Sequence, residues 1–221
     1  MAVITISRQY GSGGEEVAQR ICEILGYRYF DKTMMAQVAT EMGLLERRVV
    51  DFSETDYRVR SFLDRLLGRS RVVAEVEILE QDEATEEQRR AIEKLNEEQC
   101  IELVQMTIRA AYKYGNLVII GRGGQAVLKD AHGVLHVRIE APQGARVMRI
   151  QNKEGLSLGE ARARARERDE AAAAYIERFY GGDWRNPLLY HMVFNTGRWG
   201  LDSVAKIIGD AVTELKTVSH A

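Results

Sequence analysis

The residues Val3-Ile4-Thr5-Ile6-Ser7-Arg8-Gln9-Tyr10-Gly11-Ser12-Gly13-Gly14-Glu15-Glu16 decide the fold of this chain. Val3 to Ile6 has the apolar composition of a short buried strand, and three glycines in the next turn allow the backbone to bend tightly. A turn of this kind, placed before a helix, directs several backbone N–H groups at one point, where the helix dipole adds positive potential. The stretch therefore predicts a binding site for a phosphate group.

The turn departs from the full phosphate-loop motif, G-x-x-x-x-G-K-[ST]. Arg8 stands at the position of the first glycine, Gly14 at that of the lysine, and Glu15 at that of the serine or threonine. A second interpretation is also open, because Ser12 and Glu15 have the spacing of a capping box. In that interpretation the turn only connects two elements, and the Glu15 carboxylate itself occupies the anion site.

Short apolar segments alternate with helical patterns along most of the remaining chain. The continuous run Leu117 to Ile120 is typical of a parallel strand that is buried on both faces. Because strands and helices alternate, the sequence predicts an α/β fold whose parallel sheet is covered by helices, with ligands bound beyond the strand ends. Strands are expected at residues 3–6, 27–30, 117–120, 134–139 and 192–194, and helices after the glycine turn and at 33–42, about 158–179 and 201–215.

Residues 46–100 carry the weakest pattern, and we expect mostly helices there. The charged residues around 81–98 favour exposed surfaces in this segment. Neither an internal repeat nor a linker divides the chain. The sequence therefore predicts one domain over residues 1–221, with residues 46–100 as an insertion.

Composition limits the classes of partner. The 221 residues carry a net charge of −2 and are 45% hydrophobic, which gives no basic field for nucleic acid. No apolar run approaches the about 20 residues of a membrane span, and the first residues lack the pattern of a signal peptide. Cys22, Cys100 and the four histidines lack metal-ligand spacing. We expect a cytoplasmic protein with reduced cysteines, no metal site of its own, and no nucleic-acid or membrane partner.

Two further segments lie where ligands bind in such a fold. Gly121-Arg122-Gly123-Gly124 follows a predicted strand, and the planar fork of an arginine there can hold a phosphate through two bonds. The alternative is a turn whose arginine pairs with a surface carboxylate. Asp31 follows an aromatic strand and is either a helix cap or a group that positions an acceptor hydroxyl or a magnesium-bound water. Tyr180-Gly181-Gly182-Asp183-Trp184 has the composition of a glycine hinge with an aromatic anchor.

The predicted helix at about 158–179 is rich in arginine. At about 100° per residue, one face carries four of its polar and aromatic residues and the other side carries three. The first group is Arg164, Arg168, Tyr175 and Arg178, and the second is Arg162, Arg166 and Asp169. The helix is either a solvated surface element or a lid that closes arginines over transferring phosphates.

Taken in this order, five segments resemble the cytidylate-kinase-like branch of the P-loop nucleoside monophosphate kinases. They are Ile6 to Gly14, Tyr29-Phe30-Asp31-Lys32, Ile120-Gly121-Arg122-Gly123, Arg178-Phe179-Tyr180-Gly181 with Asp183-Trp184, and Asn195-Thr196-Gly197. The resemblance covers nearly the whole chain. It implies a three-layer P-loop kinase sandwich with a five-stranded parallel sheet, a lid at about 155–185 and an acceptor-binding insertion at 46–100.

The resemblance also implies roles for individual residues, with ATP and Mg²⁺ as cofactors and a nucleoside monophosphate or similar small phosphorylated acceptor as partner. The donor phosphates would lie on Gly11, Ser12, Gly13 and Gly14. Acceptor contacts would come from Asp31, Arg122, Arg164 and Asp169, and the catalytic cations would be Arg8, Arg168 and Arg178. Because Gly14 and Glu15 replace the lysine and the hydroxyl residue, either Arg8 or a lid arginine would supply the missing charge.

Three functions follow from these observations. The first is ATP-dependent phosphoryl transfer to a nucleoside monophosphate, with cytidylate as the usual acceptor of the family. The second, motivated by Gly14 and Glu15, is a degenerate kinase that binds a nucleotide or phosphorylated metabolite without turnover. The third is a kinase for another small acceptor, because nothing in residues 46–100 fixes the base. Exposed stripes in that segment also allow a homodimer.

Overall fold

The computed structural model describes residues 1–30, 34–35, 38, 44–45, 74–81, 88–95 and 97–218. Its centre is a five-stranded sheet in which every pair of neighbouring strands is parallel. The strand order is β2-β6-β1-β7-β8, so the N-terminal strand lies in the middle. The strands are β1 (Val3–Arg8), β2 (Arg28–Phe30), β6 (Leu117–Ile120), β7 (Val134–Glu140) and β8 (Met192–Asn195).

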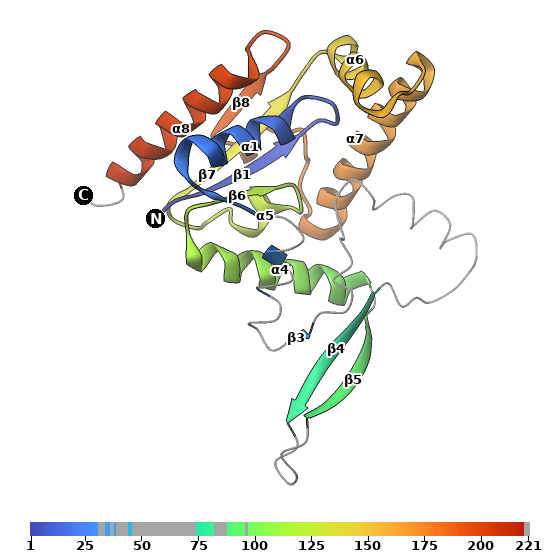
Figure 1. The fold of residues 1–221 in the computed structure, drawn as a ribbon, viewed down its shortest axis with the longest axis vertical. Coiled ribbons are helices and arrows are strands. Elements are labelled where there is room, and N and C mark those ends of the chain that lie inside the picture. Colours follow the sequence, from blue (N-terminus) through green and yellow to red (C-terminus); the bar gives the residue numbers. More distant parts are fainter. Residues whose placement is uncertain are drawn as a thin grey trace.

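Helices cover both faces of this sheet, which confirms the predicted three-layer α/β fold (Figure 1). One apolar core joins the sheet to α1 (Gly14–Leu25) and α8 (Leu201–Val218). The core on the opposite face joins it to α4 (Glu97–Tyr114), α5 (Gly124–Val127) and α7 (Leu158–Tyr180). Among the described residues, no helix has both the length and the apolar character of a membrane span.

The side-chain pattern of β1 explains why two cores form. Ile4 and Ile6 pack into the core with α1 and α8, whereas Val3 packs into the core with α4 and α7. All four residues of β6 are buried, because a central parallel strand is covered on both sides. The expected strands at 3–6, 27–30, 117–120, 134–139 and 192–194 are therefore confirmed to within two residues at each end.

The expected arginine-rich helix is also present, as α7. It begins after Ser157, whose side chain and that of Glu160 form a capping box, and it ends at Gly181 with φ 64°. The helix is preceded by α6 (Gln143–Glu154), which starts after Pro142 and ends at Gly155. These two helices contact each other and form a hairpin beside the glycine turn (Figure 1).

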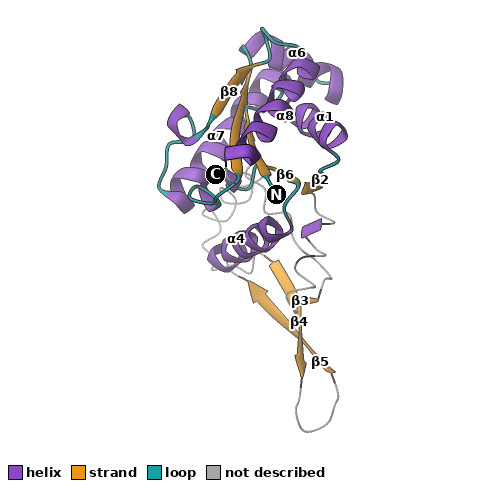
Figure 2. Ribbon diagram, turned by 90° about the vertical axis from the view of Figure 1, so that its left-hand side faces the viewer, coloured by secondary structure: helices purple, strands orange, loops and turns teal. Residues whose placement is uncertain are grey.

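Residues 74–95 differ from the expectation of mostly helices. The structure has strands β4 (Ala74–Gln81) and β5 (Gln88–Leu95), which pair antiparallel, and β3 (Leu44–Leu45) pairs with β4. In Figure 2 this hairpin extends beyond α4, away from the main sheet. The sequence from Glu75 to Ile78 alternates polar and apolar residues, a period-2 signal that the charge density of the region obscured. The expected helix at 33–42 lies mostly outside the described residues.

A stacked pair of histidines, the buried His136 and the exposed His191, links β7 to the entry of β8. His136 is 4% exposed, forms a 2.7 Å hydrogen bond with the Thr5 hydroxyl through Nδ1, and stacks on His191 with ring centroids 5.0 Å apart. Burial and the neighbouring His191 lower the pKa of His136 to about 4. The ring is therefore neutral in the folded protein at physiological pH.

We predict that His136 makes the stability of the fold fall below neutral pH. Between pH 6.5 and about 4 the unfolded chain binds a proton that the folded protein excludes, so unfolding becomes easier as pH falls. At pH 5 the loss from this one group is about 2 kcal/mol relative to pH 7.5. Urea unfolding of the protein and of His136→Asn across this range measures it. The two stability curves should converge at low pH, and curves that stay parallel contradict the prediction.

Candidate active site

The glycine turn between β1 and α1 forms one wall of a cavity of about 530 Å³. Gly11 and Gly13 have φ values of 76° and 83°, which only glycine adopts without strain. Helix α1 begins directly after Gly13, which is its N-cap residue. The opposite wall comes from α6, including Arg149, Ile150 and Lys153. The turn thus has the strand–turn–helix geometry that the sequence predicts.

The backbone N–H groups of this turn are available to a ligand. Within the described part of the chain, the amides of Gly11, Gly13 and Gly14 donate no hydrogen bond to the protein, whereas that of Ser12 bonds to the Gln9 carbonyl. The buried hydroxyl of Ser12 also lacks a partner among these residues. Unsatisfied donors at a helix N-terminus are a general feature of anion sites. The turn therefore has the donors of a phosphate cradle.

The predicted capping box of Ser12 and Glu15 does not form. Helix α1 has no side-chain cap, and the Glu15 carboxylate turns instead to Lys153, which donates a 3.0 Å hydrogen bond, and to Arg8 at 3.6 Å. Burial of Glu15 favours its neutral form, but these two cations outweigh that effect and lower its pKa. The glutamate is held at the mouth of the cavity, and the backbone donors of the turn stay open.

Arg8 and Gly14 depend on each other sterically. A Cβ atom placed on Gly14 would lie 2.6 Å from the Arg8 Cβ, so a lysine at position 14 has no room. Arg8 also lines the cavity, with a side chain that is 15% exposed. Two of the three departures from the phosphate-loop motif, Arg8 and Gly14, are therefore sterically coupled. The cation lies at the strand end rather than at the helix start.

Arg149 of α6 holds the carbonyl side of the turn. Its guanidinium donates to the carbonyl oxygens of Ser12 and Thr196, both at 2.9 Å. The Thr196 hydroxyl also donates to the Ser12 carbonyl. Because the carbonyl of Ser12 is fixed in this way, the N–H groups of the turn face the cavity. Sequence reasoning missed Arg149, since an arginine on an amphipathic helix resembles a solvated side chain.

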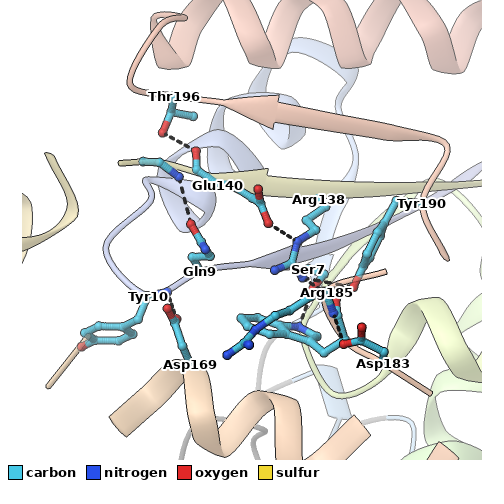
Figure 3. A network of polar contacts seen from close by, with 12 residues as sticks. Ser7, Gln9, Tyr10, Arg138, Glu140, Asp169, Asp183, Arg185, Tyr190 and Thr196 are labelled. Atoms are coloured by element: carbon cyan, nitrogen blue, oxygen red, sulfur yellow. Dashed lines mark hydrogen bonds and ion pairs between the residues drawn. The ribbon is translucent and has the colours of Figure 1, made fainter. Parts of the chain in front are cut away.

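The hairpin of α6 and α7 is fastened to the turn by Asp169. Its carboxylate accepts a 2.8 Å hydrogen bond from the Tyr10 backbone N–H (Figure 3). It also accepts a 2.6 Å hydrogen bond from Arg146. Burial raises the pKa of Asp169, although both donors favour the charged form. Arg146 donates in addition to the Tyr10 carbonyl. The expected substrate residue Asp169 is therefore already engaged in holding the loop.

Two of the predicted lid arginines reach residues of the same cavity. Arg168 lies over the Tyr10 ring at 5.7 Å, and Arg164 lies 3.8 Å from Glu154. The Tyr10 hydroxyl donates to Glu154 at 2.6 Å. Burial is the main cause that raises the pKa of Tyr10 to about 12, and the neighbouring Glu154 raises it further. Tyr10 and Glu154 line the cavity, and the two arginines contact these residues from α7 without lining the cavity themselves.

Arg122 and Arg178 do not line this cavity. Arg122 is buried after β6, has φ 57°, and donates a 3.1 Å hydrogen bond to the Phe30 carbonyl. Arg178 lies over the Phe179 ring, and the neighbouring Tyr175 is fully buried in the core, so the predicted face of Arg164, Arg168, Tyr175 and Arg178 is not a continuous ligand surface. Asp31 lies outside the described residues.

The aromatic anchor after α7 is confirmed. Trp184 is 1% exposed, and its indole N–H donates to the Ser7 hydroxyl at 2.9 Å. The guanidinium of Arg138 lies 4.1 Å from the Trp184 ring centre, and it donates to the Trp184 carbonyl and to Glu140 (Figure 3). These contacts fix the segment after α7 over the carboxyl ends of β1 and β7.

Three comparisons place this geometry among known proteins. A model of the cytidylate kinase-like family matches residues 3–198. The chain belongs to this family. It is 27% identical over 214 residues to a cytidylate kinase of Thermococcus sibiricus, covering 96% of this chain and 89% of the relative. The family identifies the chain as a nucleotide-kinase-like protein, and it implies ATP, a divalent metal and nucleotide substrates.

Solved structures confirm the fold. A crystal structure of an uncharacterized protein from Eubacterium ventriosum is 15% identical with a TM-score of 0.63, covering 96% of this chain and 99% of that one. A gluconokinase from Sinorhizobium meliloti 1021 is 10% identical with a TM-score of 0.53, covering 99% of this chain and 95% of that one. The chain therefore has the fold of the P-loop kinases.

We predict that Gly14→Ala weakens ATP binding because its new Cβ displaces Arg8 from the wall of the cavity. The loss should be about tenfold in Kd, the effect of about 1.4 kcal/mol. The matched control is Gly144→Ala, since a Cβ on this exposed glycine of α6 meets nothing within 4 Å. Calorimetric titration with ATP measures both variants. Equal Kd values for Gly14→Ala and Gly144→Ala would contradict the steric coupling of Arg8 and Gly14.

Proposed function

We propose that this protein transfers a phosphoryl group from ATP to a nucleoside monophosphate, with cytidylate as the leading acceptor. The observation that carries the proposal is that the N–H groups of Gly11, Gly13 and Gly14 donate no hydrogen bond within the described residues and lie beside a cavity whose lining includes Arg8, Arg149 and Lys153. Phosphoryl transfer requires positioning and charge neutralisation more than a protein nucleophile. This cavity offers both.

Arg8 and Lys153 take the place of the absent loop lysine in this proposal. Both reach the Glu15 carboxylate, so their charged ends lie within one cluster at the mouth of the cavity. A triphosphate carries more negative charge than one carboxylate and draws both cations away from Glu15. The positive charge then reaches the donor phosphates from β1 and α6 rather than from the start of α1.

The residues present fit ATP and Mg²⁺. The cavity of about 530 Å³ lies within the size range of small-molecule sites. Among the described residues, no group of three or more His, Cys, Asp and Glu side chains forms a metal cage. Mg²⁺ in nucleotide sites needs no such cage, because phosphates and water supply most of its ligands. A bound Mg²⁺ would neutralise charge on the donor phosphates, and the carboxylates of Glu15 and Glu16 at the start of α1 line the same cavity.

The acceptor site is assigned to the carboxyl ends of β6 and β2. Arg122 follows β6, and its contact with the Phe30 carbonyl places it beside the end of β2, next to Asp31 in the sequence. We assign to Arg122 the binding of the acceptor phosphate. We assign to Arg168 and Arg164 the stabilisation of the negative charge that develops on the transferring phosphoryl group beside α7. Closure of the α6–α7 hairpin as a lid would exclude water from the reacting phosphates.

The Glu15 cluster also favours a second candidate, a nucleotide-binding protein without turnover. A carboxylate that neutralises two cations lowers the positive charge available to a transferring phosphoryl group. In this case ATP binds to the turn, but no acceptor receives its phosphate. A turnover assay separates the two functions.

The assay supplies the purified protein with ATP, Mg²⁺ and each nucleoside monophosphate, and it follows formation of the diphosphates. We predict turnover, and a fall in kcat/KM of about 10² or more in Arg8→Ala and in Lys153→Ala, the usual cost of removing one donor from a developing charge. Lys129→Ala is the control, since Lys129 is exposed, pairs with its neighbour Asp130 and does not line the cavity.

Turnover that is equal in all three variants contradicts the roles of Arg8 and Lys153. ATP binding without diphosphate formation from any nucleoside monophosphate contradicts the kinase and supports the binding protein. Turnover with a different class of acceptor would support the proposed phosphoryl transfer and contradict only the assignment of the acceptor.

A further inference from the structure

A second cavity of about 360 Å³ lies beside the α6–α7 hairpin, and arginines dominate its lining. Arg146 comes from α6, Arg162 and Arg166 from α7, and Arg185 from the segment after α7. The lining residues of this cavity and of the phosphate-loop cavity do not overlap. This surface corresponds to the side of α7 that carries Arg162, Arg166 and Asp169, and the predicted site roles use only Asp169 of these three.

The charge balance of the cavity favours an anion. Four arginines stand against Asp169 and Glu170, and the Asp169 carboxylate is already bound to Arg146 and to the Tyr10 N–H. Arg162 and Arg166 are one helical turn apart and both exposed, an arrangement of like charges that costs stability in the absence of a counter-charge. Arg185 adds a third exposed guanidinium from another segment (Figure 3).

Arg146 contributes a buried hydrogen-bond donor to the cavity, in addition to the exposed charges of the other arginines. The residue is 8% exposed, and its Nη1 atom donates to Asp169 and to the Tyr10 carbonyl. Its buried Nε atom lacks a hydrogen-bond partner within the described part of the chain. A buried donor without a partner costs about 1–3 kcal/mol unless a ligand or water satisfies it.

We propose that this cavity is a second anion-binding site, which takes the phosphate group of a small ligand. The guanidinium fork of arginine matches phosphate oxygens in pairs, and the cavity has room for a phosphate with a small substituent. Arg146 and Asp169 both contact the Tyr10 backbone of the glycine turn, so the new site adjoins the phosphate loop. The ligand is either a separate phosphorylated metabolite or the phosphorylated acceptor, and in the second case this cavity replaces Arg122 as the site of the acceptor phosphate.

Calorimetry with pyrophosphate tests the site without requiring turnover, so its failure is separate from failure of the kinase activity. We expect Arg162→Ala/Arg166→Ala to weaken one pyrophosphate-binding event at least tenfold. The control is Arg109→Ala/Lys113→Ala, which removes two exposed cations with the same spacing from α4. All four side chains are exposed, so both double variants should fold as the unmodified protein does.

Unchanged pyrophosphate binding in Arg162→Ala/Arg166→Ala overturns the proposal. An equal loss in the α4 control also overturns it, because the effect would then come from net charge alone. A second titration with cytidine monophosphate, at saturating pyrophosphate, distinguishes the two sources of ligand. Competition that depends on Arg162 and Arg166 identifies the phosphorylated acceptor, and independent binding identifies a separate metabolite.

Discussion

The left-handed backbone at Gly11 and Gly13 is the constraint on which the rest of this protein depends. Because both residues have positive φ, the chain leaves β1 and enters α1 with its N–H groups toward one cavity. A side chain is excluded at either position, since a Cβ on Gly11 would lie 2.8 Å from the Arg146 carbonyl and one on Gly13 2.7 Å from Leu201. This geometry supplies the backbone donors that an anion site requires.

The surrounding structure holds that turn from two sides. Arg149 donates a hydrogen bond to the Ser12 carbonyl oxygen of the turn, and Asp169 accepts one from the Tyr10 N–H just before it. Both residues belong to the α6–α7 hairpin, which is joined internally by the pair of Arg146 and Asp169. Movement of this hairpin would therefore change the position of the turn. A lid motion of the hairpin would in this way also move the backbone N–H groups proposed to bind phosphate.

The fold could be predicted largely from the sequence, because its signals are local. The apolar run Leu117–Ile120 indicates a strand buried on both faces, and the glycines at 11, 13 and 14 mark the turn. The hairpin β4–β5 was missed, since antiparallel pairing of a charged segment depends on a partner strand rather than on local composition. The expected capping box failed because Lys153, 138 residues away, competes for Glu15.

The site could be predicted only in part. Gly11 to Gly14 and Arg8 were found from one continuous segment, whereas Arg149, Lys153 and Arg146 become neighbours of that segment only when α6 packs beside it. The spacing of these residues in the sequence does not indicate that they contact the segment. Arg138 was missed for a related reason, because a strand pattern does not reveal a buried arginine that lies against the Trp184 ring.

The most direct test of the phosphate cradle observes its backbone amides. In ¹⁵N-labelled protein, addition of ATP with Mg²⁺ should shift the amide resonances of Gly11, Gly13 and Gly14 and slow their hydrogen exchange, because each N–H gains an acceptor. The amide of Ser12, which already donates to Gln9, should change less. If ATP binds while the resonances of the three glycines remain unchanged, the nucleotide lies elsewhere and the central claim is wrong.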